Sequence, residues 1–244
     1  MKMKKIFLVM ALAIVSLATA SAQLKIGVKA GMNTSTISGI KESFGDADEL
    51  LEKAGVISLS TPYKVGFHVG ITAQYLFTDA LGIETGLFYS QMGGRKKAAL
   101  LGETMVISTT LNPSYLQLPV QLLYKIDLGS GLALVPSAGM YVGYGLGGKV
   151  VYDAKASNSL IETGLKAGIE LLGQPELFKP KSEGGRDMNR LDYGATFGLN
   201  VEYQKFTIGL GYDLGLARLN KEAALSGYKD LKNRNFKVSV GYLF

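Results

Sequence analysis

The sequence predicts an all-β fold, an eight-stranded antiparallel up-and-down transmembrane β-barrel. Three observations predict it. Apolar residues recur at every second position in eight segments. The other face of these segments is rich in glycine with isolated charges, and short connections alternate with long ones. Glycine makes up 31 of 244 residues, which is unusual for strands unless one face lines a crowded interior.

The N-terminus has the pattern of a secretory signal peptide. Three lysines precede an apolar run over residues 6–15, and small residues follow at Ala18, Ala20 and Ala22. This run is too short to cross a bilayer as a helix, which needs about 20 residues. We therefore expect a cleaved signal peptide at residues 1–22 and a barrel domain at residues 23–244. Cleavage after Ala20 is the alternative.

Charge and cysteine usage narrow the function classes. Removal of the signal peptide leaves 23 basic and 20 acidic residues, a formal charge of +3. No basic run is interleaved with aromatic residues, so we expect no nucleic-acid partner. Because cysteine is absent, an exported domain of this size must be held together without disulfides, by one large core or by a closed barrel.

The eight period-two segments are the predicted strands. They span residues 24–33, 65–77, 81–90, 116–126, 132–146, 191–201, 206–216 and 235–244. The apolar face of each would meet lipid, and the face of glycine and polar residues would line a narrow lumen. A soluble barrel, with the apolar face in its core, is the alternative.

The lumen face carries isolated titratable residues. We predict eight as lumen residues: Lys25, Lys29, His68, Glu84, Lys125, Asp192, Asp213 and Lys237. Eight strands leave an interior just wide enough for side chains. A structural network of salt bridges is therefore favoured over an ion path.

The connections predict which end of the barrel faces which compartment. Those at residues 78–79, 127–130 and 202–205 are short, as periplasmic turns are. The long ones span residues 34–62, 94–109, 148–190 and 217–233, and we expect them to be extracellular loops.

Two long connections contain helix-compatible spacing, at residues 43–54 and 157–172. The second would carry an apolar stripe of Leu160, Ile161, Leu165, Ile169 and Leu172. This stripe predicts either a partner-binding cap or a loop packed on its own barrel rim.

Several segments resemble the PorT-type outer-membrane β-barrel family of Bacteroidetes. Residues 234–244 resemble its last strand, and the Tyr-Leu-Gln-Leu-Pro-Val run at residues 115–120 resembles its fourth. Motifs around Pro136, Asp192 and Asp213 stand in the family's order. The resemblance covers nearly the whole mature chain and implies an eight-stranded barrel of a functionally diverse family.

The end of the chain is similar to the signal that barrel-assembly machinery reads. A terminal aromatic residue is preceded by apolar residues at alternate positions: Phe236, Val238, Val240, Tyr242 and Phe244. The same pattern would also arise from a lipid-facing last strand, and the two interpretations are compatible.

Nothing in the sequence identifies an enzyme. His68 is the single histidine, so a multi-histidine metal site is not available. An enzyme would need His68 as base with a serine such as Ser90 as nucleophile. We expect no catalytic, cofactor-binding or metal-binding residues and no cofactor.

The function expected is that of a non-enzymatic bacterial outer-membrane barrel, an envelope, adhesion or secretion-assembly component that binds a protein partner through its extracellular loops. Its other partners would be outer-membrane lipid and the barrel-assembly machinery. The alternative is a small-ligand-binding barrel, membrane-bound or soluble and lipocalin-like.

Overall fold

The computed structural model describes residues 24–39, 56–100, 104–220 and 230–244. The expected signal peptide and the predicted helix at residues 43–54 lie outside these ranges. The strands are β1 (Leu24–Ser38), β2 (Ile57–Ser60), β3 (Lys64–Leu76), β4 (Leu81–Gln91), β5 (Gly94–Leu100), β6 (Met105–Tyr124), β7 (Ile126–Gly129), β8 (Leu132–Ala156), β9 (Leu191–Tyr203), β10 (Phe206–Gly215) and β11 (Lys232–Leu243). The helices are α3 (Ser159–Leu172) and the short 3₁₀ helix η2 (Lys181–Glu183).

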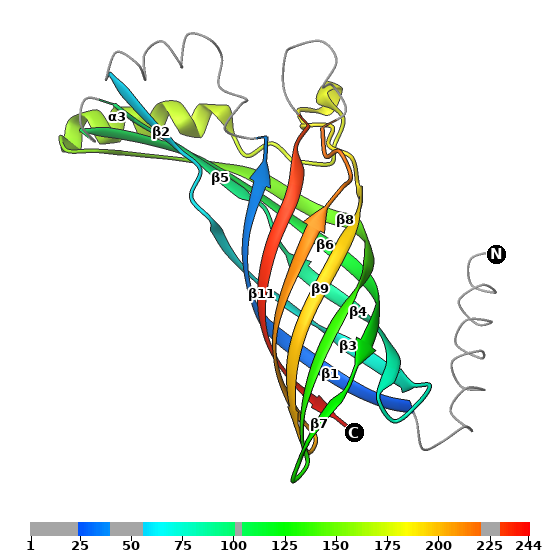
Figure 1. Cartoon of the computed structure of the whole chain (residues 1–244). Helices are drawn as coiled ribbons and strands as arrows, with labels where there is room; N and C mark the ends of the chain where they lie inside the picture. Colours follow the sequence, from blue (N-terminus) through cyan, green and yellow to red (C-terminus); the bar gives the residue numbers. More distant parts are fainter. Residues whose placement is uncertain (1–23, 40–55, 101–103, 221–229) are drawn as a thin grey trace.

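Eight of these strands close into a barrel. The order around it is β1, β3, β4, β6, β8, β9, β10 and β11, each antiparallel to the next, and β11 pairs with β1. Figure 1 shows the tilted strands and the chain's C-terminus at the narrow end of the barrel. The predicted fold class is confirmed.

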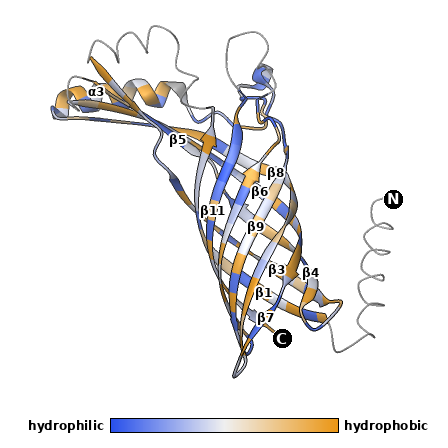
Figure 2. Ribbon diagram, in the orientation of Figure 1, coloured by the Kyte–Doolittle hydropathy of each residue, from blue (hydrophilic) through white to orange (hydrophobic). Residues whose placement is uncertain are grey.

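The register explains why the two faces of each strand differ. Ala30 on β1 pairs with Val240 on β11 and with Val69 on β3, so these residues share the outer face. Val240 is 59% exposed and Val69 is 48% exposed, whereas Lys29, one residue away from Ala30, is 7% exposed. Figure 2 shows the resulting alternation of apolar and polar residues along the strands. An exposed apolar outside around a polar inside is the arrangement that lipid requires.

The three short connections lie together at one end, the short-turn end. Ser130 and Gln204 adopt positive φ angles of 54°, which tight turns between strands use. At residues 77–81, the hydroxyl of Thr78 accepts a hydrogen bond from the Leu81 amide at 2.9 Å. β7 is a brief continuation of the β6–β8 turn, where Ile126 pairs with Leu134.

The opposite, long-loop end departs from the sequence prediction. Residues 94–109 were expected to form a loop, but β5 and the start of β6 make a hairpin in which Leu100 pairs with Met105. The strand expected to end at residue 146 continues as β8 to Ala156. Four of the five residues at 106–110 are β-branched, which favours this strand, although its alternation is weak.

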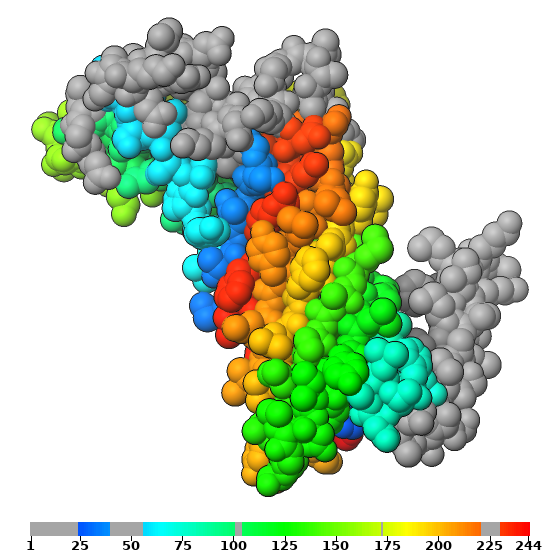
Figure 3. Space-filling model, in the orientation of Figure 1, coloured from blue at the N-terminus to red at the C-terminus, as the bar shows by residue number. Residues whose placement is uncertain are grey.

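These extensions form a small sheet outside the barrel, which we call the platform. It consists of β2, β5, residues 105–111 of β6 and residues 150–156 of β8. Beyond residue 144, β8 no longer pairs with β9, so the platform leaves the barrel wall and projects from its side. Figure 3 shows β1, β11, β10 and β9 side by side on the barrel, with the platform standing off from them.

Two glycines allow the bend between barrel and platform. Gly93 has φ +138° and Gly148 has φ +152°, angles that other residues rarely adopt. A Cβ at Gly93 would lie 2.0 Å from the Leu111 carbonyl oxygen, and one at Gly148 would lie 2.5 Å from the Asn112 carbonyl oxygen. Both glycines therefore permit close approach to the same part of β6, from either side.

The helix predicted at residues 157–172 is present as α3. The side chain of Asn158 caps its N-terminus by accepting hydrogen bonds from the amides of Leu160 and Ile161. Gly173, with φ +65°, ends it. Among the described residues, no helix is both long and apolar enough to span a membrane.

Candidate functional site

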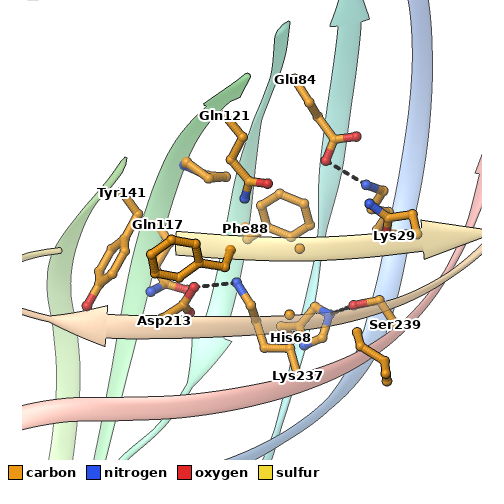
Figure 4. A pocket seen from close by; sticks show the side chains of 16 residues that line it. Lys29, His68, Glu84, Phe88, Gln117, Gln121, Tyr141, Asp213, Lys237 and Ser239 are labelled. Atoms are coloured by element: carbon orange, nitrogen blue, oxygen red, sulfur yellow. Dashed lines mark hydrogen bonds and ion pairs between the residues drawn. The ribbon is translucent and has the colours of Figure 1, made fainter. Parts of the chain in front are cut away.

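The centre of the lumen is occupied by two ion pairs. Lys29 Nζ lies 2.6 Å from Glu84 Oε1, and Lys237 Nζ lies 2.7 Å from Asp213 Oδ1. These residues come from β1, β4, β10 and β11, and Figure 4 shows the two pairs facing one another across the interior. The cavity left between them has a volume of about 60 Å³, which is room for a few water molecules.

His68 lies in this cavity wall as a hydrogen-bonded residue. Its Nδ1 is 2.7 Å from Asn33 Oδ1, and its Nε2 is 2.9 Å from Ser239 Oγ. Ser90 contacts Asn33 instead, accepting a hydrogen bond from its amide nitrogen at 3.0 Å. The geometry therefore does not place Ser90 and His68 as the hydrogen-bonded pair that nucleophilic catalysis would use.

A second network fills the lumen toward the short-turn end. Lys125 pairs with Glu202 at 3.1 Å, and Gln74 donates to both Glu84, at 2.6 Å, and Glu202, at 3.2 Å. Lys25 is half-buried on the same face of β1 as Lys29. Below this network, Leu123, Ala133 and Val135 form a small apolar cluster with Leu76.

Asp192 lies nearer the long-loop end and is completely buried. Its Oδ2 accepts hydrogen bonds from Asn233, at 2.8 Å, and from the Tyr141 hydroxyl, at 3.2 Å. Asp213 is also held by Thr196 and Asn235. The structure thus places all eight predicted lumen residues on the inner face. Five of them form three ion pairs, in which Glu202 is the one member that was not predicted. His68 is bound by Asn33 and Ser239, and Asp192 is bound by neutral donors.

An apolar plug closes the lumen at the long-loop end. Its residues are Leu177, Phe178, Met188 and Leu219 from the loops, Met92 from the connection between β4 and β5, and Ile37, Tyr115 and Val150 from the strands. Gly145 makes room for it, since a Cβ there would lie 2.4 Å from Phe178 Cζ. The guanidinium of Arg190 stacks over the Phe178 ring at 5.3 Å.

Sequence analysis missed this plug because the loop at residues 148–190 lacks the strand period. The available signal was Leu177-Phe178, an apolar pair inside an otherwise polar stretch. Backbone hydrogen bonds fix the loop, from the Leu177 amide to the Gly148 carbonyl and from the Gly145 amide to the Arg190 carbonyl. The lumen is therefore filled along its length by side chains.

The platform is the second candidate site, because it presents apolar side chains to the outside. In the predicted apolar stripe of α3, Leu160 is 82% exposed and Ile161 is 47% exposed, whereas Leu165 and Ile169 are half-buried. The stripe is thus divided between exposed and half-buried side chains. Leu171, which lies outside the stripe, is 91% exposed. The side chain of Lys166 donates a hydrogen bond to Glu162 and thereby lowers the pKa of that carboxyl.

The residues of the predicted assembly signal lie on β11 and at the end of the chain. Phe236, Val238, Val240 and Phe244 face outward, and Phe244 is 69% exposed. The Phe244 amide donates to the Ile26 carbonyl at 2.8 Å, which fastens the end of the chain to β1. The Tyr242 ring contacts Phe244 edge-on, with centroids 5.3 Å apart.

The described part of the chain offers no group of three histidine, cysteine, aspartate or glutamate side chains that could hold a metal ion. The closed strand order, the apolar outer band and the polar, filled interior define a β-barrel of the outer-membrane class. The chain matches the family model described as "Outer membrane protein beta-barrel domain" over residues 19–220, and it belongs to this family. The protein resides in the bacterial outer membrane.

Comparison with solved structures finds other barrels at low sequence identity. Ail, the attachment invasion locus protein of Yersinia pestis, is 10% identical, with 91% of this chain and 99% of that chain covered and a TM-score of 0.38. OprG from Pseudomonas aeruginosa is 14% identical, with 90% and 95% covered and a TM-score of 0.40. Neisserial surface protein A is 13% identical, with 91% and 97% covered and a TM-score of 0.43. No curated protein sequence matches the chain.

Proposed function

We propose that this barrel is a non-enzymatic envelope component whose extracellular platform binds a protein partner. The observation that carries the proposal is the length of β6 and β8. They contain 20 and 25 residues, whereas a tilted strand needs about 9–11 to span the bilayer. The excess residues serve no purpose in lipid, and they hold an ordered surface away from the membrane.

The exposed side chains of the platform suit a protein partner. Leu160 and Leu171 stand out from α3, and Ile107 on β6 is 36% exposed. Large exposed apolar side chains gathered outside the lipid band are typical of interaction surfaces. The strand edges of the platform add backbone groups that a partner strand could pair with.

The filled lumen favours this function over transport or ligand storage. Its central cavity of about 60 Å³ is well below the roughly 300–1,000 Å³ of small-molecule sites. The engagement of His68 by Asn33 and Ser239 supports the non-enzymatic part of the proposal. We also propose that the chain belongs to the PorT-type branch of the family, because residues 115–120 and 234–244 resemble the fourth and last strands of that branch.

The proposal is tested by site-specific photo-cross-linking on living cells. A cross-linker placed at Leu160 or Leu171 should capture a discrete protein, and one at Asp127 on the periplasmic turn should not. Leu160→Glu with Leu171→Glu should abolish capture from a cross-linker at Ile107 while the barrel keeps its heat-modifiable gel mobility. Equal capture from all positions, or capture unchanged by the two substitutions, would contradict a platform partner.

A further inference from the structure

A cleft opens at the extracellular rim, where the sheet divides between barrel and platform. It has a volume of about 350 Å³, within the range of small-molecule sites. Lys64, at the start of β3, and Arg95, at the start of β5, line it together with Gln91, Thr110 and Asn112. The two cations come from strands that are not paired at this point, since β5 pairs with β2 and β6.

Of the described residues that line the cleft, two are positively charged and none is negatively charged. Lys64 is 6% exposed, and its ammonium makes a long contact, 3.5 Å, with the Val65 carbonyl oxygen. Arg95 uses Nε to donate to the Thr110 hydroxyl at 3.2 Å. Among the described residues no carboxylate lines the cleft or pairs with either cation. A buried ammonium beside a guanidinium is unfavourable until an anion neutralises both.

We propose that this cleft binds a phosphoryl group. A guanidinium presents planar, paired N–H donors, and an ammonium adds a compact point charge, a combination suited to a tetrahedral oxyanion with several acceptor oxygens. The amides of Gln91 and Asn112 supply further N–H donors around the same space. Arg95 and Thr110 belong to the platform, but binding of a phosphoryl group here does not require the protein partner proposed above.

The position of the cleft makes a lipid headgroup one source of that phosphoryl group. Tyr63 lines the cleft and is 67% exposed, and Val65, the next outward residue, is 61% exposed and begins the lipid-facing series of β3. Tyrosine beside the end of an apolar band marks a membrane interface, where lipid phosphates lie. A soluble phosphate ester outside the cell would offer the same chemistry.

The first test uses inorganic phosphate and the full-length barrel in a neutral detergent. Phosphate should raise the midpoint temperature of unfolding, which is followed by heat-modifiable gel mobility. The rise should be saturable and larger than the rise with chloride at the same ionic strength. Lys64→Gln with Arg95→Gln should weaken this effect about tenfold or more, because each removes a charge-assisted contact. Arg218→Gln, at the same end but paired with Asp230 at 2.6 Å, is the matched control and should respond as the wild type does.

The second test identifies the source. The barrel is reconstituted in phosphatidylcholine containing either phosphatidic acid or the neutral diacylglycerol, and the lipids retained are measured by native mass spectrometry. Retention of phosphatidic acid by the wild type and not by the double variant supports a lipid source. Protection by inorganic phosphate without lipid retention supports a soluble ester.

Because Lys64 is buried, Arg95→Gln alone and the conservative Lys64→Arg accompany the double variant. Arg95→Gln should weaken phosphate protection with unchanged folding, and Lys64→Arg should retain it. The proposal is overturned if the double variant responds as the wild type does in both tests, or if neither probe has an effect on the wild type.

Discussion

The ring of Phe178, from the loop that follows α3, stands edge-on against the ring of Tyr115 on β6, with centroids 6.0 Å apart and an angle of 78°. A residue from the middle of a long connection is thereby inserted into the barrel mouth. Since both side chains are buried, the loop is part of the folded core.

Removing this ring should destabilise the barrel. Phe178→Ala leaves a cavity in the plug, for which about 3–5 kcal/mol of unfolding free energy is the usual cost. Urea unfolding in detergent, followed by heat-modifiable gel mobility, measures the loss. Leu160→Ala, at an 82% exposed position, is the control and should change little. Equal effects of the two would show that the plug does not contribute to stability.

The filled lumen predicts the absence of transport. Purified protein in planar bilayers should give no steady conductance on the scale of general porins. Phe178→Ala should not change this, because the ion pairs of Lys29 with Glu84 and Lys237 with Asp213 remain below the plug. Stable large channels from the wild-type protein would show that the lumen is open in the membrane.

The pair formed by Lys237 and Asp213 should be costly to break on one side. Asp213→Asn leaves a largely buried ammonium without its carboxylate, which is expected to cost about 3–5 kcal/mol. Replacing both residues, as in Asp213→Asn with Lys237→Met, should recover much of the loss. Glu162→Gln breaks an exposed pair on α3 and should have no measurable effect on urea unfolding. A double variant as unstable as Asp213→Asn would contradict the pairing argument.

The bend between barrel and platform gives a prediction with an adjacent control. Gly148→Ala forces a positive φ on alanine and places Cβ 2.5 Å from the Asn112 carbonyl oxygen, so a cost on the order of 1–3 kcal/mol is expected. Gly147→Ala, one residue earlier, meets no atom within 4 Å and should be tolerated. Comparable urea midpoints for the two variants would exclude strain at the bend.

The last strand separates stability from assembly. Val240→Lys places a charge toward the middle of the lipid band at a cost of about 2–4 kcal/mol, whereas Phe244→Lys near the interface should cost only about 0–1 kcal/mol. If assembly machinery reads the terminal pattern, Phe244→Lys should lower folded yield in cells far more than it lowers stability after refolding from urea. Heat-modifiable mobility of both preparations measures this. The same yield by both routes would leave Phe244 with a packing role alone.

The sequence by itself determined the barrel and the inner face of each strand. Period-two alternation is a local property of the backbone, so it places Lys29, His68 and Asp213 inside without knowledge of their neighbours. Turn residues and the spacing of α3 are equally local. These features were predictable because each depends on residues a few positions apart.

Only the tertiary structure decided what those residues contact. Lys29 and Glu84 are 55 positions apart, and their pairing depends on strand register, which alternation alone does not set. The plug and the platform were missed for the same reason. Leu177 and Phe178 follow no period, and they are ordered by the strands they meet. The cleft between Lys64 and Arg95 exists because the chain bends at Gly93, between β4 and β5, so that β5 turns away from the barrel wall. Such a division of the sheet is a property of the assembled barrel.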